Sequence, residues 1–206
     1  MTAPARERAV VFDLGNTLVR WDPRNFYKTL ISDPARLDEF LTDVCPMAWH
    51  AQHDRGVSMA ANMARRAARR PDFAGEVLQW RAGWRAMFDG PIEGSVRLME
   101  RLEARNVPLY ALTNLPAEVF DWLVEDFPFI ARFRDVVVSG VEGVIKPHPR
   151  IFEITTQRIG AAPADTVFID DNADNIAAAQ ALGFDAVLFE GAEPLEAALR
   201  ARNLLD

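Results

Sequence analysis

The chain has 206 residues, of which 50% are hydrophobic, and a formal net charge of -7 at pH 7. This length allows one domain, or one domain with a sizeable insertion, and the composition is that of an ordinary globular protein, which excludes disordered and fibrous classes. The acidic charge opposes the basic surface that binding to nucleic-acid phosphates requires. We therefore expect no nucleic-acid partner.

No apolar stretch approaches the roughly 18 residues of a membrane span. The N-terminal segment MTAPARERAVVFD holds only a four-residue apolar run before Asp13, which is too short for the hydrophobic region of a signal peptide. We expect a cytoplasmic protein with no membrane partner. The one cysteine, Cys45, excludes an internal disulfide and provides no zinc-site spacing, so we expect a buried free thiol.

Short aliphatic runs predict five buried strands, and helical periodicity between proline and glycine boundaries predicts the helices that alternate with them. The expected strands are Ala9–Phe12, Val107–Leu112, Val136–Val138, Thr166–Ile169 and Ala186–Phe189. The expected helices are Glu93–Arg105, Pro116–Glu125, Pro149–Ile159, Asp174–Leu182 and Pro194–Asn203. This alternation predicts an α/β fold with a doubly wound parallel sheet, in which ligands bind outside the carboxyl ends of the strands.

Residues 19–91 interrupt the alternation, because they contain no convincing strand and several helical stretches. The expected helices there are Arg24–Ile31, Pro34–Val44, Pro46–Arg55, Ser58–Arg70 and Phe73–Phe88. We therefore expect two units, a core of residues 1–18 and 92–206 and an inserted all-helical cap of residues 19–91.

Polar residues stand where the predicted strands end, and such residues should meet in one crevice. They are Asp13 after the first strand, Thr113 and Asn114 after the second, Lys146 before the helix at Pro149, and Asp170 and Asp171 after the fourth. Each motif alone is weak, since a carboxylate after a strand often only caps a helix or a turn. Together, close carboxylates need a counter-ion, and Mg²⁺ suits them because it prefers carboxylate oxygens and also takes phosphate oxygens of a substrate.

This set of side chains predicts phosphate chemistry. With Mg²⁺ and Lys146 balancing the charge, Asp13 can attack a phosphoryl group in line and form an aspartyl phosphate that water hydrolyses. Thr113 and Asn114 supply hydroxyl and amide donors beside it. The predicted reaction is hydrolysis of a phosphate monoester.

In order and residue type these motifs resemble those of the haloacid dehalogenase-like hydrolases, and the insertion lies where the helical C1-type cap of that family lies. The run Phe12–Leu18 and the segment Thr166–Ile176 are similar to bacterial phosphatases that act on glucose 1-phosphate and to the phosphatase domain of soluble epoxide hydrolases. The resemblance implies a Rossmann-like core and assigns roles to individual residues. These are Asp13 as nucleophile and metal ligand, the carbonyl of Leu14 or Gly15 near the metal, Thr113 and Lys146 on the phosphoryl oxygens, and Asp171 as principal metal ligand with Asp170 assisting.

One position departs from the family pattern. The family has a second aspartate two residues after the nucleophile, which protonates the leaving group, and this chain has Gly15 there. Either the leaving group needs little protonation, as with an anomeric sugar oxygen, or another residue supplies the proton, for which His50, His53 and His148 are candidates. For His148 the sequence favours a solvent-facing loop over the role of proton donor. The glycine itself can also serve backbone freedom.

His50, His53 and Asp54 share one face of a predicted cap helix. In resembling caps this stretch approaches the substrate, so we expect His50 and His53 to bind substrate, with a plain polar cap surface as the alternative. Trp80 and Trp84 have helical spacing and are predicted to pack in the cap core, where an indole can also border a sugar ring.

Three functions fit the sequence. The first is a magnesium-dependent phosphatase for a small phosphorylated metabolite, with a sugar phosphate as the expected substrate. The second is a 2-haloacid dehalogenase that uses Asp13 without a metal, and the third is a weakly catalytic protein that binds a phosphorylated metabolite. The resembling dehalogenases carry small hydroxyl residues in place of Asp170 and Asp171, and two carboxylates without a cation would repel an anionic haloacid. The sequence therefore favours the phosphatase and leaves the exact substrate and oligomeric state open.

Overall fold

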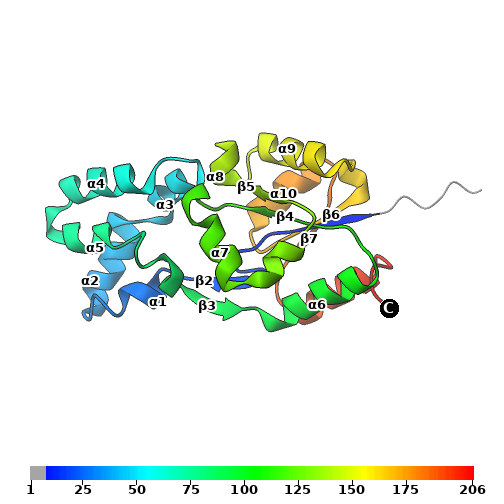
Figure 1. Cartoon of the computed structure of the whole chain (residues 1–206), viewed down its shortest axis with the longest axis horizontal. Helices are drawn as coiled ribbons and strands as arrows, with labels where there is room; N and C mark the ends of the chain where they lie inside the picture. Colours follow the sequence, from blue (N-terminus) through cyan, green and yellow to red (C-terminus); the bar gives the residue numbers. More distant parts are fainter. Residues whose placement is uncertain (1–7) are drawn as a thin grey trace, which may run out of the picture.

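The computed structural model describes residues 8–206, so residues 1–7 of the predicted core segment lie outside it. Five parallel strands form the main sheet in the order β5-β4-β1-β6-β7, with β1 in the centre (Figure 1). The strands are β1 (Ala9–Phe12), β4 (Leu109–Thr113), β5 (Val136–Val138), β6 (Thr166–Asp170) and β7 (Asp185–Leu188). The doubly wound α/β fold predicted from the sequence is confirmed, and the predicted strand ends differ from the observed ones by at most two residues.

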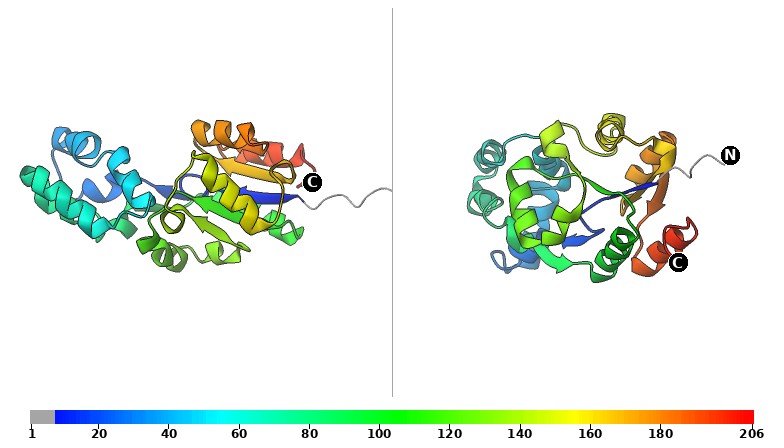
Figure 2. Two further views of the ribbon diagram at one scale, coloured as in Figure 1. Left: turned by 90° about the horizontal axis from the view of Figure 1, so that it is seen from above. Right: turned by 45° about the vertical axis from the view of Figure 1, so that its right-hand side comes forward.

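Alternate side chains of β1 belong to two hydrophobic cores, one on each face of the sheet. Val10 and Phe12 pack in the core that includes α6 (Glu93–Ala104) and α11 (Ala192–Arg200). Val11 packs in the other, with residues of α9 (Pro149–Ile159) and α10 (Ala173–Ala181). Because helices cover both faces of the sheet (Figure 2), all four residues of β1 are buried, as a central parallel strand requires.

The remaining helical elements of the core lie between β4 and β6 in the sequence. They are α7 (Phe120–Asp126), α8 (Ser139–Glu142) and the 3₁₀ turns Ala117–Val119, Pro128–Arg132 and Pro163–Asp165. Among residues 8–206, no helix is both long enough and apolar enough to cross a bilayer.

The insertion is a separate group of short helices at the end of the molecule opposite the C-terminus (Figure 1). It contains α1 (Arg24–Tyr27), α2 (Pro34–Glu39), a π-helix (Phe40–Val44), α3 (Met47–Asp54), α4 (Met59–Arg69), α5 (Ala74–Leu78) and the 3₁₀ turns Pro71–Phe73 and Trp84–Met87. The long helix expected over Phe73–Phe88 is wrong, because the helix ends at Leu78. Gly83 disfavours helix, and the Phe26 ring fills the space beside it, 2.1 Å from where a Cβ would stand.

Two short strands that the sequence pattern does not predict join the cap to the core. β2 (Val19–Trp21) pairs antiparallel with β3 (Phe88–Pro91), so the prediction that residues 19–91 hold no strand is wrong at both ends of that segment. Each strand is only three or four residues long and includes charged residues, glycine or proline, which gives no alternating pattern to detect. The cap is therefore helical except for this ribbon at its base.

Aromatic side chains fill the interior of the cap. Tyr27 and Trp80 are fully buried and lie 5.5 Å apart between ring centroids, and Trp84 is also buried. This confirms the predicted packing of both tryptophans. Cys45 is a buried free thiol, as predicted.

Glycines allow the end of α3 to approach the core closely. Gly56 follows α3 with a φ of +84°, and a Cβ there would stand 2.9 Å from the carbonyl oxygen of Gly140. A Cβ at Gly140 would in turn stand 2.5 Å from the backbone nitrogen of Ala117. The Ser139 hydroxyl also donates a hydrogen bond to the Asp54 carbonyl at 2.7 Å. These contacts fix the last turn of α3 against α8, the short helix that directly follows β5.

We expect the substitution Gly140→Ala to lower the free energy of unfolding by about 1–3 kcal/mol, because the added methyl group meets backbone atoms that cannot yield easily. Gly75→Ala is the matched control. Gly75 lies in α5, where a Cβ meets no atom within 4 Å in the described part of the chain, so alanine should stabilise by about 0.5–1 kcal/mol. Urea unfolding measures both variants, and equal stability of the two would contradict the close packing at Gly140.

Candidate active site

A tight turn directly after β1 places Asp13 at the carboxyl edge of the sheet. The Asp13 N–H donates to the Ile169 carbonyl at 2.8 Å, which continues the pairing of β1 with β6. The Leu14 carbonyl accepts hydrogen bonds from the N–H groups of Leu18 and Val19, at 2.9 and 3.0 Å. Asn16 has a φ of 54°, a conformation that asparagine tolerates better than most residues. The turn therefore reverses the chain immediately beyond Asp13.

The Lys146 ammonium group is the centre of the site. Its Nζ lies 2.8 Å from Asp13 Oδ1, 2.7 Å from Asp170 Oδ2 and 2.9 Å from the Leu112 carbonyl, so each of its three protons has an acceptor. The lysine is only 2% exposed. Burial alone would lower the pKa of Lys146, but the charges and hydrogen bonds of Asp13 and Asp170 outweigh burial and raise it. Lys146 is therefore held as a cation.

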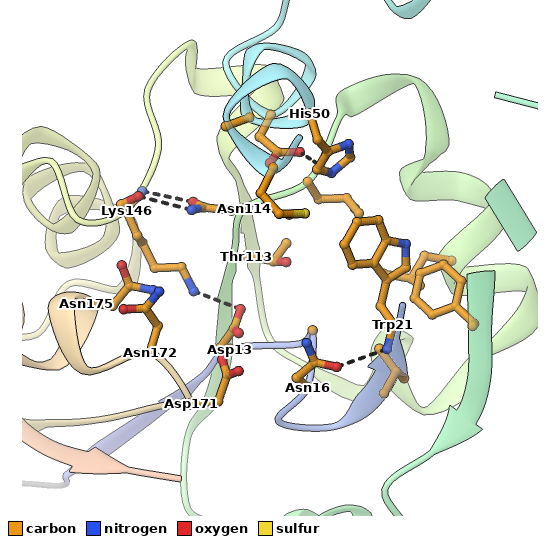
Figure 3. A pocket seen from close by; sticks show the side chains of 18 of the residues that line it. Asp13, Asn16, Trp21, His50, Thr113, Asn114, Lys146, Asp171, Asn172 and Asn175 are labelled. Carbon is orange, nitrogen blue, oxygen red and sulfur yellow. Dashed lines mark hydrogen bonds and ion pairs between the residues drawn. The ribbon is translucent and has the colours of Figure 1, made fainter. Parts of the chain in front are cut away.

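The residues at the end of β4 position Lys146 and line the same cavity. The Asn114 side chain accepts from the Lys146 N–H at 2.9 Å and donates to the Lys146 carbonyl at 3.1 Å. Asn114, predicted from the sequence as a catalytic donor, thus holds the loop that carries Lys146. Thr113 is buried and lies between Asp13 and His50 in the cavity (Figure 3).

The two acidic residues after β6 have different surroundings. Asp170 is fully buried and does not line the cavity. Its Oδ1 accepts from the Asn172 N–H at 2.8 Å and the Asn175 amide at 2.9 Å, while its Oδ2 faces Lys146. The Asp171 side chain lines the cavity beside Asp13 (Figure 3). Asp170 therefore orients Lys146, whereas Asp171 faces the cavity.

The carboxylates form a cluster whose donor chemistry suits a hard cation. Asp13, Asp170 and Asp171 each offer one oxygen, and these three oxygens lie within 4.8 Å of one another. The pKa of Asp13 is raised to about 7, chiefly by burial and also by the charges of Asp170 and Asp171, although Lys146 acts in the opposite direction. One ammonium thus balances three carboxylates incompletely. An all-oxygen site with excess negative charge fits Mg²⁺.

The geometry narrows the predicted ligand set. Of the two backbone candidates, the Leu14 carbonyl is engaged in the turn after β1, and Gly15 lines the cavity. The residues able to hold the cation are therefore Asp13, Asp171 and the backbone of Gly15. The predicted assisting role of Asp170 fits less well, because both of its oxygens already accept hydrogen bonds.

A cavity of about 300 Å³ connects these groups to the cap. Its polar end belongs to the core, and its other end is apolar and aromatic. The Trp21 and His50 rings stack with centroids 4.9 Å apart, and the His50 and Trp84 rings stack at 5.5 Å. Figure 3 shows Trp21 and His50 across the cavity from Lys146 and Asp171. The apolar lining consists of Val19, Trp21, Met47, Ala51, Trp84, Phe88, Leu115 and Leu123.

The three histidines occupy different environments. His50 is buried and lines the cavity, with its Nε2 3.4 Å from Asp54 Oδ1. His53 is buried inside the cap, where its Nε2 lies 3.0 Å from the Asn62 amide, and does not line the cavity. His148 is exposed, and its Nδ1 accepts from the Arg150 N–H at the start of α9. Of the histidines considered as substrate ligands or proton donors, only His50 is therefore placed in the cavity.

Asp54 and Trp21 line the cavity without having been predicted to bind or react. For Asp54 the available signal was its place one turn after His50 and directly before Arg55 and Gly56, where the helix ends. Trp21 gave no signal, because its strand was not recognised.

Burial lowers the pKa of His53 from 6.5 to about 4. The unfolded chain therefore binds more protons than the folded protein once the pH falls below 6.5, and the folded state loses stability as the pH falls. We expect the stability difference between wild type and His53→Gln to shift by about 2 kcal/mol against wild type between pH 7 and pH 5. Urea unfolding at the two pH values measures it, and other titrating groups cancel in the difference. If the stability difference between wild type and His53→Gln does not change with pH, folding does not lower the pKa of His53.

Comparison with known proteins agrees with this geometry. Residues 7–183 match the haloacid dehalogenase-like hydrolase family. The chain belongs to this family. A sesquiterpene phosphatase of Aspergillus oryzae is 26% identical over 179 residues, covering 85% of this chain and 86% of that protein. Flavin mononucleotide hydrolase 1 of Arabidopsis thaliana is 27% identical over 194 residues, covering 90% of this chain and 74% of that protein.

Solved structures of other haloacid dehalogenase-like proteins have the same fold. A family enzyme from Bacteroides thetaiotaomicron superposes with a TM-score of 0.72 at 23% identity, covering 94% of this chain and 98% of that one. The same enzyme in complex with magnesium and inorganic phosphate superposes with a TM-score of 0.67 at 24% identity, covering 89% and 94% of the two chains. The finer resemblance to glucose 1-phosphate phosphatases and epoxide hydrolases stays a prediction.

Proposed function

We propose that this haloacid dehalogenase-like hydrolase is a magnesium-dependent phosphatase that hydrolyses a small phosphate monoester through an aspartyl phosphate on Asp13. The observation that carries the proposal is the contact of the Lys146 ammonium with Asp13 Oδ1, at the edge of a cavity that Asp171 also lines. The ammonium favours the charged form of Asp13, and a charged carboxylate oxygen is the nucleophile that phosphoryl transfer needs. A fixed cation beside it stabilises the charge on the transferring group.

Mg²⁺ bound by Asp13, Asp171 and the Gly15 carbonyl would supply positive charge that offsets both the carboxylates and the incoming phosphoryl oxygens. The donor set described above supports this assignment. The magnesium and phosphate complex of the similarly folded Bacteroides enzyme is consistent with it.

The reaction proceeds in two displacements at phosphorus. In the first, an Asp13 carboxylate oxygen bonds to phosphorus while the bond from phosphorus to the organic oxygen breaks, and that oxygen takes up a proton. In the second, water attacks the aspartyl phosphate, loses a proton, and releases inorganic phosphate with Asp13 restored. Lys146 balances negative charge in both steps, and the Thr113 hydroxyl donates to a phosphoryl oxygen.

The cavity lining suggests the class of organic group. Trp21 offers a flat apolar face beyond the phosphate end, and Asn16 lines the cavity near it. A single ring with one apolar face fits such a wall, since aromatic side chains gain most from flat contacts. We propose a ring-bearing monoester, a class that includes the sugar phosphates predicted from the sequence. The organic groups named for the Aspergillus and Arabidopsis relatives also contain carbon-rich parts that suit an apolar wall.

We expect phosphate release from ring-bearing monoesters in the presence of Mg²⁺, and its loss both in EDTA and in Asp13→Asn, because the amide lacks the charged nucleophile. A panel of sugar 1-phosphates, aryl phosphates, glycerol phosphate and 2-haloacids, assayed for phosphate and halide, makes the measurement. Ring-bearing esters should exceed glycerol phosphate in kcat/KM by about tenfold, the worth of one aromatic contact.

The matched control for Asp13→Asn is Asp43→Asn, which makes the same chemical change at an exposed residue of the cap. It should keep full activity. Halide release without metal would favour the dehalogenase, and binding of phosphate esters without turnover would favour the binding protein. Either result would overturn the proposed phosphatase.

We expect Asp171→Asn to weaken Mg²⁺ binding and raise the Mg²⁺ concentration needed for half-maximal activity by at least about tenfold, because the site loses one of its few charged ligands. Titration calorimetry with Mg²⁺ alone measures binding separately from turnover. Unchanged Mg²⁺ affinity would place the metal ligands elsewhere.

A further inference from the structure

The cap carries an acidic side chain positioned to perform the proton transfer for which this chain lacks the usual residue. We propose that Asp54 donates the proton to the departing organic oxygen and afterwards accepts a proton from the attacking water. This inference rests on the proposed phosphatase function and assigns its missing acid.

Asp54 is placed for this role by its position in the cavity. It lines the same cavity as Asp13, from the cap side, and is 5% exposed. Its Oδ1 makes no hydrogen bond within residues 8–206, and the nearest basic nitrogen, His50 Nε2, lies 3.4 Å away. A buried carboxyl oxygen without a hydrogen bond costs free energy, so a bound substrate that donates one to it recovers that cost. This oxygen, which has only the long contact with His50, thus marks a binding contact.

The backbone around Asp54 is fixed to the core. The Asp54 carbonyl accepts the Ser139 hydroxyl, which also accepts the Leu115 N–H at 3.0 Å. Gly56, two residues after Asp54, packs closely against Gly140. Because Thr113 and Asn114 directly precede Leu115, the same core segment that holds the phosphate end also holds Asp54. The carboxyl group therefore has a defined position relative to Asp13.

The protonation states distinguish Asp54 from the neighbouring histidine. Burial raises the pKa of Asp54 to about 7, against the opposing charges of Arg55 and Lys146, so the carboxyl holds a proton in part of the molecules at neutral pH. Burial lowers the pKa of His50 to about 3, with His53 adding to the effect, so His50 is neutral and has no acidic proton to give. An acid whose pKa lies near the working pH is the effective one.

Gly15 is not required by the backbone. It does not have the positive φ that favours glycine, and a Cβ there meets no atom within 4 Å in the described structure. A side chain would fit, so steric exclusion does not explain the missing aspartate. Proton donation from the opposite, cap side of the cavity does explain how the site functions without it.

The proton balance of the two steps is complete. As the bond from phosphorus to the organic oxygen breaks, the proton moves from the Asp54 carboxyl to that oxygen, and a neutral alcohol leaves. The resulting Asp54 carboxylate then takes one proton from the water that bonds to the aspartyl phosphate. Inorganic phosphate leaves, and Asp13 and Asp54 return to their starting states.

The test compares kcat/KM of wild type and Asp54→Asn for aryl and alkyl phosphates whose leaving groups range from nitrophenol to a primary alcohol. We expect the two proteins to agree within a few-fold for nitrophenol, which leaves without a proton. For the alcohol we expect Asp54→Asn to lose about 10²–10⁴-fold, the usual worth of general acid catalysis. Asp43→Asn is the matched control and should behave as wild type for every leaving group.

A second variant separates proton donation from damage to the cap. The double variant with Gly15→Asp and Asp54→Asn has an acid on the core side of the cavity. Its kcat/KM should recover for the substrates that release an alcohol and should change little for the nitrophenyl ester. An equal loss on all leaving groups, or an Asp54→Asn profile identical to wild type, would overturn the role of Asp54. Failure of the phosphatase function itself looks different, because wild type would then release no phosphate even from the nitrophenyl ester.

Discussion

The buried contact of Lys146 with Asp13 and Asp170 is the interaction on which the site depends. Taking an ammonium and two carboxylates out of water is costly, and their mutual attraction offsets that cost only when the geometry is good and the remaining donors are paired. The third ammonium proton, on the Leu112 carbonyl, completes that pairing. The lysine thereby connects the carboxyl ends of β1, β4 and β6. The carboxylate charge it leaves unbalanced is the reason the site suits a divalent cation.

The core and the cap divide the chemistry. The groups that we propose to contact the phosphoryl group come from the ends of core strands and from the turn before α9, which Asn114 holds by two hydrogen bonds to the Lys146 backbone. The aromatic wall comes from the cap and from the ribbon at its base, and so does Asp54. Docking of the end of α3 on α8, through Ser139 and Gly140, brings the two sets into one cavity. We therefore expect a change in that docking to affect substrate choice and proton transfer more than it affects the position of Asp13.

The core half of the site could be predicted from the sequence because the carboxyl ends of parallel strands meet at one edge. Correct strands were enough to place Asp13, Thr113 and Asp171 together, whereas Lys146 lies in the turn before α9 and was grouped with them by its residue type. Their individual roles were harder to predict, because neighbouring residues at a strand end point in opposite directions. Only the three-dimensional structure distinguishes the buried Asp170 from Asp171, which faces the cavity. The cap half was not predictable in the same way. His50 and His53 share a helix face, yet only His50 reaches the cavity, because the orientation of α3 depends on contacts distant in the sequence.

The proposed mechanism requires that Asp13 carries the phosphoryl group during turnover. The most direct measurement is to quench wild-type enzyme in acid during steady-state hydrolysis of an aryl phosphate with Mg²⁺ and to locate the phosphoryl group by peptide mass spectrometry. We predict a phosphoryl group on Asp13 that is present only with substrate and Mg²⁺. A phosphoryl group found on a different residue would contradict this mechanism. So would the absence of any phosphorylated peptide from an enzyme that releases its alcohol product in a rapid burst before steady-state turnover.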